Sequence, residues 1–369
     1  MKTILIANKI IKANETMNAK TRVRKTFAHE KTDRVTIGYS ANPGIHQRLK
    51  NVIGANNDED LLHALGVDYR GIGAPYTGKP LYEELPGRKR KLDGAVMRWI
   101  EHSSGGYWDY CDFPLKDVSE EVFDTFPVPN PDDFDYQTAL DQAKNYGKDM
   151  GIYIGHPGVA DIINSNGMLM GMEDVLCHLA TACEPALRYI NRRADLFLGM
   201  MERLLDKCRN HIDFVWYGED LGTQRGPLIG RDLYLNVMKP IHKKFFDLSN
   251  AYNKPCIVHT CGSSSWVYND FIEMGVAGVD TLQPEAADMS PEYLKARFGN
   301  KLCYRGCIST TGTLTFGTPS EVTDIVKRTL AVMMDGYGYH FAPAHQIQDN
   351  TPVENVLAMY QTAHNYGVY

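Results

Sequence analysis

The sequence has few cysteines and no long hydrophobic run, and each shortage excludes a class of protein. Eight cysteines among 369 residues are too few for a disulfide scaffold, and the absence of a C-x-x-C pair disfavours a closed structural zinc site. No window approaches the roughly 18 consecutive apolar residues that a membrane-spanning helix needs. The apolar run from Ile4 to Ala7 is too short for a signal peptide. We therefore expect a cytoplasmic protein whose thiols stay reduced.

A basic excess is also absent. The chain has 39 Lys and Arg against 45 Asp and Glu, a net charge of −6, which argues against a dedicated nucleic-acid binder. Hydrophobic residues make up 43% and charged residues 23%, as in ordinary globular proteins, so a disordered or collagen-like chain is excluded. No repeat of roughly 20 to 50 residues is visible, which disfavours a solenoid or propeller.

Short apolar segments that alternate with longer helical segments organise the chain. The segments expected to be strands are 34–39, 67–72, 151–155, 214–218, 256–259, 278–282, 302–308 and 339–342. Eight strand–helix units predict parallel strands closed into an α/β fold, a (β/α)₈ TIM-type barrel that occupies residues 1–369 as one domain with N-terminal helices. A doubly wound open sheet is the alternative, but no G-x-G-x-x-G or Walker A sequence follows any strand.

Residues 73–135 interrupt this pattern. The segment is rich in proline, glycine and aromatic residues and has weak helical periodicity, so we expect an insertion of hairpins and ordered loops. It is either a surface excursion or a cap over the barrel mouth, because long ordered loops are often lids. If it is a cap, Tyr107, Trp108 and Tyr110 would cover a substrate. If it is an excursion, the same side chains pack the insertion itself.

In a barrel of this type the functional site lies where the strands end. The expected strand ends are dense in side chains that bind metals or transfer protons. They carry Asn42, His46, His156, Glu219, Asp220, His259, Cys261, Gln283, Glu285, Cys307 and His345. Each residue alone has an ordinary structural explanation, and their convergence on one rim favours a functional one.

The sharpest local feature is HTCG at 259–262, directly after an apolar strand. His259 and Cys261 stand two apart on an extended segment, so both side chains point the same way, and imidazole and thiolate are good zinc ligands. A third ligand from another strand end would leave one position open, as in a catalytic zinc site. The candidates for that ligand are His345, Cys307 and Glu219.

Several motifs in a fixed order extend over residues 32–367. They are DRV at 33–35, GEDLGTQ at 218–224, HTCG at 259–262, FGTPSEV at 316–322 and APAHQIQDNTPVENVLAMY at 342–360. In this order the chain resembles the uroporphyrinogen decarboxylase superfamily. Within it, the middle segment with GGYWDYCDFPL is similar to the corrinoid-dependent methyltransferases, including methylcobalamin:coenzyme M methyltransferases and O-demethylase methyltransferases.

The resemblance also separates branches of that superfamily. The decarboxylases carry an arginine-rich M-R-Q-A-G-R-Y motif, and the corresponding stretch here, GYSANPGIHQR at 38–48, lacks it. The methyltransferases bind zinc through a His-x-Cys pair and a later Cys, six residues before a Thr-Pro-x-x-Asn element. Here the pair corresponds to His259 and Cys261, the element is 351–355, and the later position is His345. This departure puts coenzyme M in doubt as the acceptor, and Cys307 stays an alternative ligand.

The resemblance implies a zinc-dependent methyltransferase that moves a methyl group between a small donor, such as a methoxylated aromatic, and the cobalt of a corrinoid. Glu219 and Asp220 would act as an extra ligand or position the substrate, and His156 and Gln283 would line the pocket, with Tyr107 and Trp108 as its cover.

The chain lacks a D-x-H-x-x-G cobalamin loop, so we expect the corrinoid on a partner protein that docks at the C-terminal barrel rim. A homodimer is the ordinary default for such barrels. The alternatives are a metal-independent decarboxylase or lyase of the same fold, and a barrel that only binds a ligand.

Overall fold

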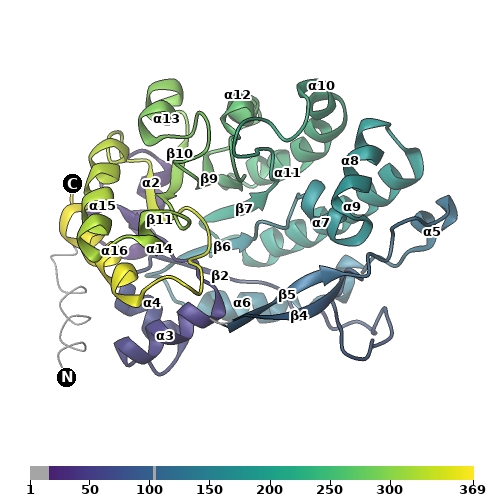
Figure 1. Ribbon diagram of the computed structural model, residues 1–369, viewed down its shortest axis with the longest axis horizontal. Helices are drawn as coiled ribbons and strands as arrows, with labels where there is room; N and C mark the ends of the chain where they lie inside the picture. Colours follow the sequence, from purple (N-terminus) through teal and green to yellow (C-terminus); the bar gives the residue numbers. More distant parts are fainter. Residues whose placement is uncertain (1–15, 103–104) are drawn as a thin grey trace.

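The computed structural model describes residues 16–102 and 105–369, and the segment that bears on a signal peptide lies outside them. Its parallel strands form a sheet in the order β1-β11-β10-β9-β8-β7-β6-β2, with the helices around it (Figure 1). The strands are β1 (Thr36–Ile37), β2 (Tyr69–Gly71), β6 (Gly151–Gly155), β7 (Phe214–Gly218), β8 (Cys256–His259), β9 (Gly278–Leu282), β10 (Cys303–Ile308) and β11 (Tyr339–Pro343). Each lies within, or extends by one residue, a segment predicted from the sequence, so the predicted (β/α)₈ barrel is confirmed.

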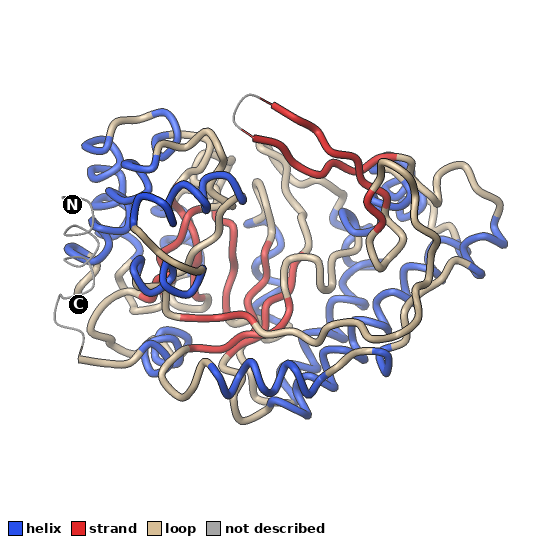
Figure 2. The backbone as a smooth tube through the Cα atoms, turned by 90° about the horizontal axis from the view of Figure 1, so that it is seen from below, coloured by secondary structure: helices blue, strands red, loops and turns tan. Residues whose placement is uncertain are grey.

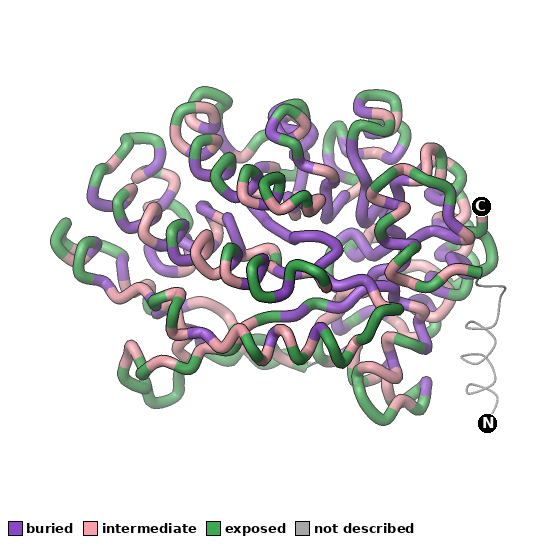
Figure 3. Tube along the Cα trace, turned by 180° about the vertical axis from the view of Figure 1, so that it is seen from behind, coloured by how far each residue is buried: buried purple, intermediate pink, exposed green. Residues whose placement is uncertain are grey.

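The helices cover the outside of the strands. They are α2 (Ala19–Phe27), α3 (Pro43–Ile53), α4 (Asp58–Leu65), α6 (Tyr136–Asn145), α7 (Ile163–Met170), α8 (Met172–Ala180), α9 (Glu184–Cys208), α10 (Arg231–Leu233), η2 (Tyr234–Met238), α11 (Lys239–Ala251), η3 (Ser265–Val267), α12 (Tyr268–Glu273), α13 (Pro291–Phe298), α14 (Thr313–Phe316), α15 (Pro319–Met333) and α16 (Val353–Tyr366). Figure 3 shows buried residues along the strands and on the inner helix faces, with exposed residues on the outer turns. Across the described ranges, no helix combines the length and apolar character needed to cross a bilayer.

Asp68 closes the barrel where β1 meets β2. Its backbone N–H donates to the carbonyl of Ile37 at 2.9 Å, and its side chain accepts from the backbone N–H of Ile37 at 2.7 Å. The same buried carboxylate pairs with Arg22 at 2.5 Å and with Arg34 at 2.7 Å. Two arginines therefore neutralise one carboxylate that holds the last strand pair together.

The basic stretch 22–25 has the composition of a solvated helix face, but Arg22 is fully buried. Its guanidinium also binds the carboxylate of Asp33 at 2.8 Å. A buried guanidinium needs charged partners, and both of its carboxylates lie outside α2, where the helical pattern gives no sign of them.

The insertion forms a second, antiparallel sheet. Its strands are β3 (Lys89–Arg90), β4 (Val96–His102) and β5 (Gly105–Cys111), followed by α5 (Glu120–Thr125) and η1 (Pro131–Asp133). Figure 2 shows the long β4–β5 hairpin lying apart from the barrel strands. A cleft of about 950 Å³ separates the hairpin from the loop after β11, with Trp99 and Tyr107 on one side and Gln346 and Asp349 on the other.

Candidate metal centre at the barrel rim

Two strands bring three potential metal ligands together at the carboxyl ends of the barrel. His259 ends β8, Cys261 follows two residues later, and His345 lies just after β11. One ligand atom from each of the three residues lies within 4.8 Å of the other two. The turn depends on Gly262, which has φ 69°, and a Cβ there would lie 2.6 Å from the backbone of Gly222.

His259 has the orientation of a metal-binding imidazole. Its Nε2 lies 3.4 Å from the Sγ of Cys261, and its Nδ1 lies 2.9 Å from a carboxylate oxygen of Asp280. An Nδ1–H that donates to Asp280 leaves the lone pair of Nε2 directed at the cluster, as in the carboxylate–histidine–zinc arrangement. The hydroxyl of Thr281 lies 2.5 Å from the same Nδ1.

Asp280 is kept ionised although it is completely buried. Burial alone would raise its pKa, but the charge of Arg305, 2.5 Å away, and the hydrogen bond from His259 hold that pKa far below its usual value. Burial acts to lower the pKa of His259, and the Asp280 carboxylate outweighs it, so the net shift is upward. Arg305, Asp280 and His259 thus form a hydrogen-bonded chain that ends at the cluster.

The remaining two groups also fit a soft divalent cation such as zinc. Burial lowers the pKa of His345, and the nearby His259 lowers it further, so His345 is a neutral imidazole able to donate a lone pair. Burial and the negative charge of Asp220 raise the pKa of the Cys261 thiol far above neutrality. That thiol therefore becomes a ligand only when a cation displaces its proton.

Cys307 is not brought to this cluster. Its side chain is buried in the hydrophobic core of the barrel wall, and burial raises the pKa of its thiol. The electrostatic neighbours of that thiol include the phenols of Tyr268 and Tyr339. Of the candidates for a third ligand, the structure therefore places His345, and neither Cys307 nor Glu219, beside the His-x-Cys pair.

The two adjacent acidic residues after β7 have different surroundings. Glu219 is buried and accepts hydrogen bonds from the backbone N–H groups of Ile162 and Ile163, at 2.6 and 3.1 Å, where α7 begins. Burial raises the pKa of Glu219 to about 8 despite these bonds. Asp220 accepts from the backbone N–H of Cys261 at 2.8 Å. Asp220 thus touches the cluster, and Glu219 supports the segment behind it.

The other predicted pocket residues are distributed over three places. His156 lines a cavity of about 310 Å³ at the barrel mouth, together with His259 and His345. Gln283 instead accepts from the backbone N–H of Gly262 at 2.8 Å, so it holds the HTCG turn. Tyr107 and Trp108 are half exposed and line the cleft beside the hairpin.

The barrel-mouth cavity also contains side chains that the sequence analysis did not single out. Asp280, Arg305, Trp216 and Tyr153 all line it from inside strands. Asp280 and Arg305 could have been found from the sequence, because each is a charged residue inside an otherwise apolar strand. The strands are GVDTL at 278–282 and CYRGCI at 303–308. A buried charge is retained only with a partner, and such partners gather at functional sites.

Fold and site together define a (β/α)₈ barrel with a candidate His/Cys/His metal centre at its C-terminal rim. Residues 213–366 match the family model described as uroporphyrinogen decarboxylase (URO-D), and this match confirms the predicted resemblance to that superfamily. Among solved structures, a methyltransferase from Methanosarcina mazei is similar in fold, with a TM-score of 0.66 and 16% sequence identity over 95% of this chain and 99% of that chain. A search of curated proteins found no match.

Proposed function

We propose that the protein is a zinc-dependent methyltransferase that moves a methyl group between a small methylated donor and the cobalt of a corrinoid carried by a partner protein. The observation that carries the proposal is the cluster of His259, Cys261 and His345 at the barrel rim. The superfamily match over residues 213–366 and the fold of the Methanosarcina mazei methyltransferase support it.

In this proposal the three clustered residues hold the zinc ion. When bound, the ion would supply Lewis-acid chemistry toward the methyl-bearing heteroatom of the donor. Asp280 fixes the ring of His259 through Nδ1, and Asp220 and Gln283 fix the turn that carries Cys261. These contacts hold the ligand atoms in place before the substrate arrives, which reduces the reorganisation needed for reaction.

The barrel-mouth cavity provides the donor site. Its volume of about 310 Å³ is at the lower end for small-molecule pockets, and Tyr39, Tyr153 and Trp216 supply aromatic walls. A single-ring methyl ether fits these dimensions and this chemistry. His156, at the end of β6, reaches the same cavity, and burial lowers the pKa of its imidazole, so it offers a neutral ring to the substrate.

The corrinoid protein would dock over the C-terminal rim, where it can reach the cavity. The β4–β5 hairpin would act as the cap of residues 73–135, and the cleft of about 950 Å³ beside it gives the partner or the donor an approach. Trp99, Tyr107 and Trp108 are exposed on this hairpin, which is uncommon for large aromatic side chains without a binding role.

The test is an ultraviolet–visible assay with the full-length protein, free cob(I)alamin and a panel of phenyl methyl ethers. We expect methylcobalamin to form with at least one ether, and we expect chelation of zinc to stop the reaction and added zinc to restore it. The matched control is the His259→Ala variant, whose metal content is measured in parallel.

Two outcomes would contradict the proposal. If the protein as isolated bound no zinc and its activity survived chelation, a metal-independent lyase or decarboxylase would be favoured. If His259→Ala and Cys261→Ala left every measured activity unchanged, the cluster would have no part in catalysis, and a barrel that only binds a ligand would be favoured.

A further inference from the structure

Two side chains that line the barrel-mouth cavity carry hydrogen-bond donors with no partner among the described residues. They are Nη2 of Arg305 and Nε1 of Trp216. Arg305 is 4% exposed and Trp216 is 8% exposed, so open solvent does not satisfy these groups. Buried polar groups are nearly always hydrogen-bonded, and an exception at a cavity wall indicates a missing partner.

The rest of the Arg305 guanidinium is firmly held. Its Nε donates to the hydroxyl of Tyr69 at 2.8 Å, and its Nη1 donates to Asp280 at 2.5 Å. The guanidinium carbon also lies 4.6 Å from the ring centroid of Trp216. The two unpartnered donors therefore belong to stacked side chains, and three contacts fix the direction of Nη2.

The chemistry of these atoms limits what they bind. A guanidinium N–H and an indole N–H are both donors without acceptor capacity, so the complementary group is an acceptor. A guanidinium, which stays charged, favours an anionic acceptor, and a planar carboxylate has the shape that arginine recognises best.

The position of the donors relates them to the metal centre. Asp280 binds Arg305 through Oδ1 and His259 through Oδ2, so a single carboxylate separates the guanidinium from the candidate metal ligand. A ligand that reaches both ends of the cavity must therefore be small. This agrees with the cavity volume of about 310 Å³.

We infer that Arg305 and Trp216 form a subsite for a carboxylate on the ligand of this cavity, so that the methyl donor is a small organic acid. The inference rests on the proposed function for the methyl group and on the two unpartnered donors for the carboxylate. Arg305 binds the anionic end of the ligand, and the methyl-bearing end lies toward His259 and His345.

The experiment measures the dissociation constants of two matched probes by calorimetry on the full-length protein. The probes are 4-methoxybenzoate and 4-methoxybenzamide, which have nearly the same shape and differ in charge. We expect the carboxylate to bind at least tenfold more tightly than the amide. Arg305→Met should reduce this ratio to less than twofold, and Arg305→Lys, which keeps the charge, should restore part of it.

A second variant covers the case in which loss of Arg305 unfolds the barrel by leaving Asp280 without its cation. Trp216→Phe removes one donor and keeps an aromatic ring, and we expect it to lower the ratio severalfold. Arg193→Met is the control, because Arg193 is buried, pairs with Asp93 at 3.2 Å and does not line this cavity. It should leave the ratio unchanged.

Benzoate and benzamide, which carry no methyl group to transfer, separate this inference from the proposed function. If benzoate binds at least tenfold more tightly than benzamide while no ether yields methylcobalamin, the carboxylate subsite stands and the methyltransferase proposal falls. If acid and amide bind equally in both pairs, the subsite is overturned, whatever the methyl-transfer assay shows.

Discussion

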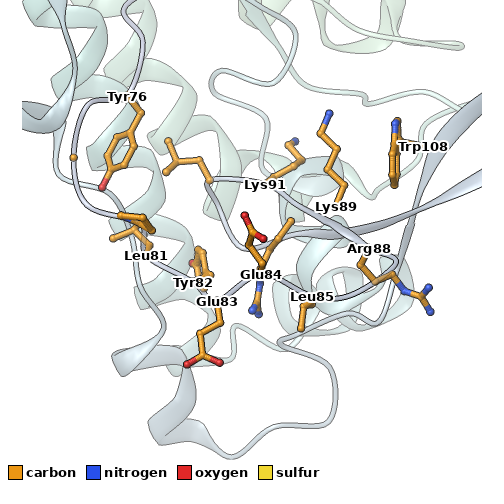
Figure 4. Close-up of a pocket in the computed structure, with 14 residues that line it drawn as sticks. Tyr76, Leu81, Tyr82, Glu83, Glu84, Leu85, Arg88, Lys89, Lys91 and Trp108 are labelled. Atoms are coloured by element: carbon orange, nitrogen blue, oxygen red, sulfur yellow. The ribbon is translucent and has the colours of Figure 1, made fainter.

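Two of the hollows in this molecule, one in the insertion and one at the barrel mouth, differ in size and in the state of their charges. A hollow of about 700 Å³ lies within the insertion, where Figure 4 shows Lys89 and Lys91 extending toward the same side as Trp108. Its ion pair, Arg88 with Asp112 at 2.8 Å, is exposed on both partners. The barrel-mouth cavity is less than half as large, about 310 Å³, but its Arg305–Asp280 pair is buried.

The comparison shows that the larger of the two hollows is not the one whose charges are buried. Exposed ion pairs between flexible side chains contribute little, since water already solvates both charges. Removing a charge from water costs free energy, so buried charges have partners in fixed positions, and their pKa values differ from those of exposed groups. Asp280 and His259 have such shifts, and both lie at the barrel mouth.

The largest difference between the two regions should appear in stability. Asp68→Asn removes the charge that holds Arg22 and Arg34 at the closure of the barrel, and breaking a buried ion pair costs about 3–5 kcal/mol. We expect a loss of that size in the free energy of unfolding, measured with denaturant. The same change in the insertion, Asp112→Asn, breaks an exposed pair and should have no measurable effect. Equal losses in both variants would contradict the comparison.

Cysteine substitutions provide the next largest effect. Substitutions of residues that only contact a metal ligand lower metal affinity by at most about 100-fold. Cys261→Ala removes a proposed ligand itself, so we expect it to lower the affinity for zinc by more than that. Cys307→Ala should bind zinc like the unchanged protein and lose only core stability, since Cys307 lies in the barrel wall. A chromophoric chelator in competition, with metal analysis, measures both. If Cys307→Ala lost zinc and Cys261→Ala kept it, Cys307 and not Cys261 would be the zinc ligand.

The barrel strands could be predicted because their signal is local. A segment such as 256–259 is a short apolar run between helical segments, and it is observed as β8 with the same bounds. The burial of Arg22 could not be predicted in this way, because Asp68, which pairs with it, lies 46 positions along the chain. The helical stretch that ends at Ala251 likewise contains a π turn at Tyr234–Met238, directly before the Lys239–Pro240 step.

The positions of side chains at the rim could be predicted where the strand is regular, and could not be predicted where the strand is irregular. His259 and Cys261 follow a regular strand, and the two-residue spacing placed both ligand atoms at the cluster. Cys307 was expected at the same rim, but the backbone of β10 is irregular at Gly306 and Cys307, which have φ 116° and 70°. Two consecutive residues with positive φ interrupt the alternation of side chains along a strand, and Cys307 lies in the barrel wall. The sequence carries no sign of this irregularity apart from Gly306.

Asp280→Asn tests whether a buried carboxylate at the barrel mouth affects zinc affinity, in contrast to an exposed carboxylate in the insertion. The amide keeps the shape of the side chain but accepts more weakly from the Nδ1 of His259, which loosens the ring and reduces its basicity. We expect zinc affinity to fall by about 10- to 100-fold, a smaller loss than in Cys261→Ala. Asp133→Asn in the insertion is the matched control and should bind zinc unchanged. Unaltered zinc affinity in Asp280→Asn would show that the carboxylate does not orient the ligand.

The smallest expected effect tests whether the insertion acts on the barrel at all. Tyr107 is 51% exposed on β5, where its ring lies 6.1 Å from that of His102, and a surface substitution usually changes stability by no more than about 0.5 kcal/mol. We expect Tyr107→Ala to unfold like the unchanged protein and to keep its zinc. If residues 73–135 cover the mouth, the same variant should raise KM for the methyl donor severalfold and leave kcat nearly unchanged. Steady-state kinetics distinguish the two cases, because an insertion that is only a surface excursion leaves KM unaltered as well.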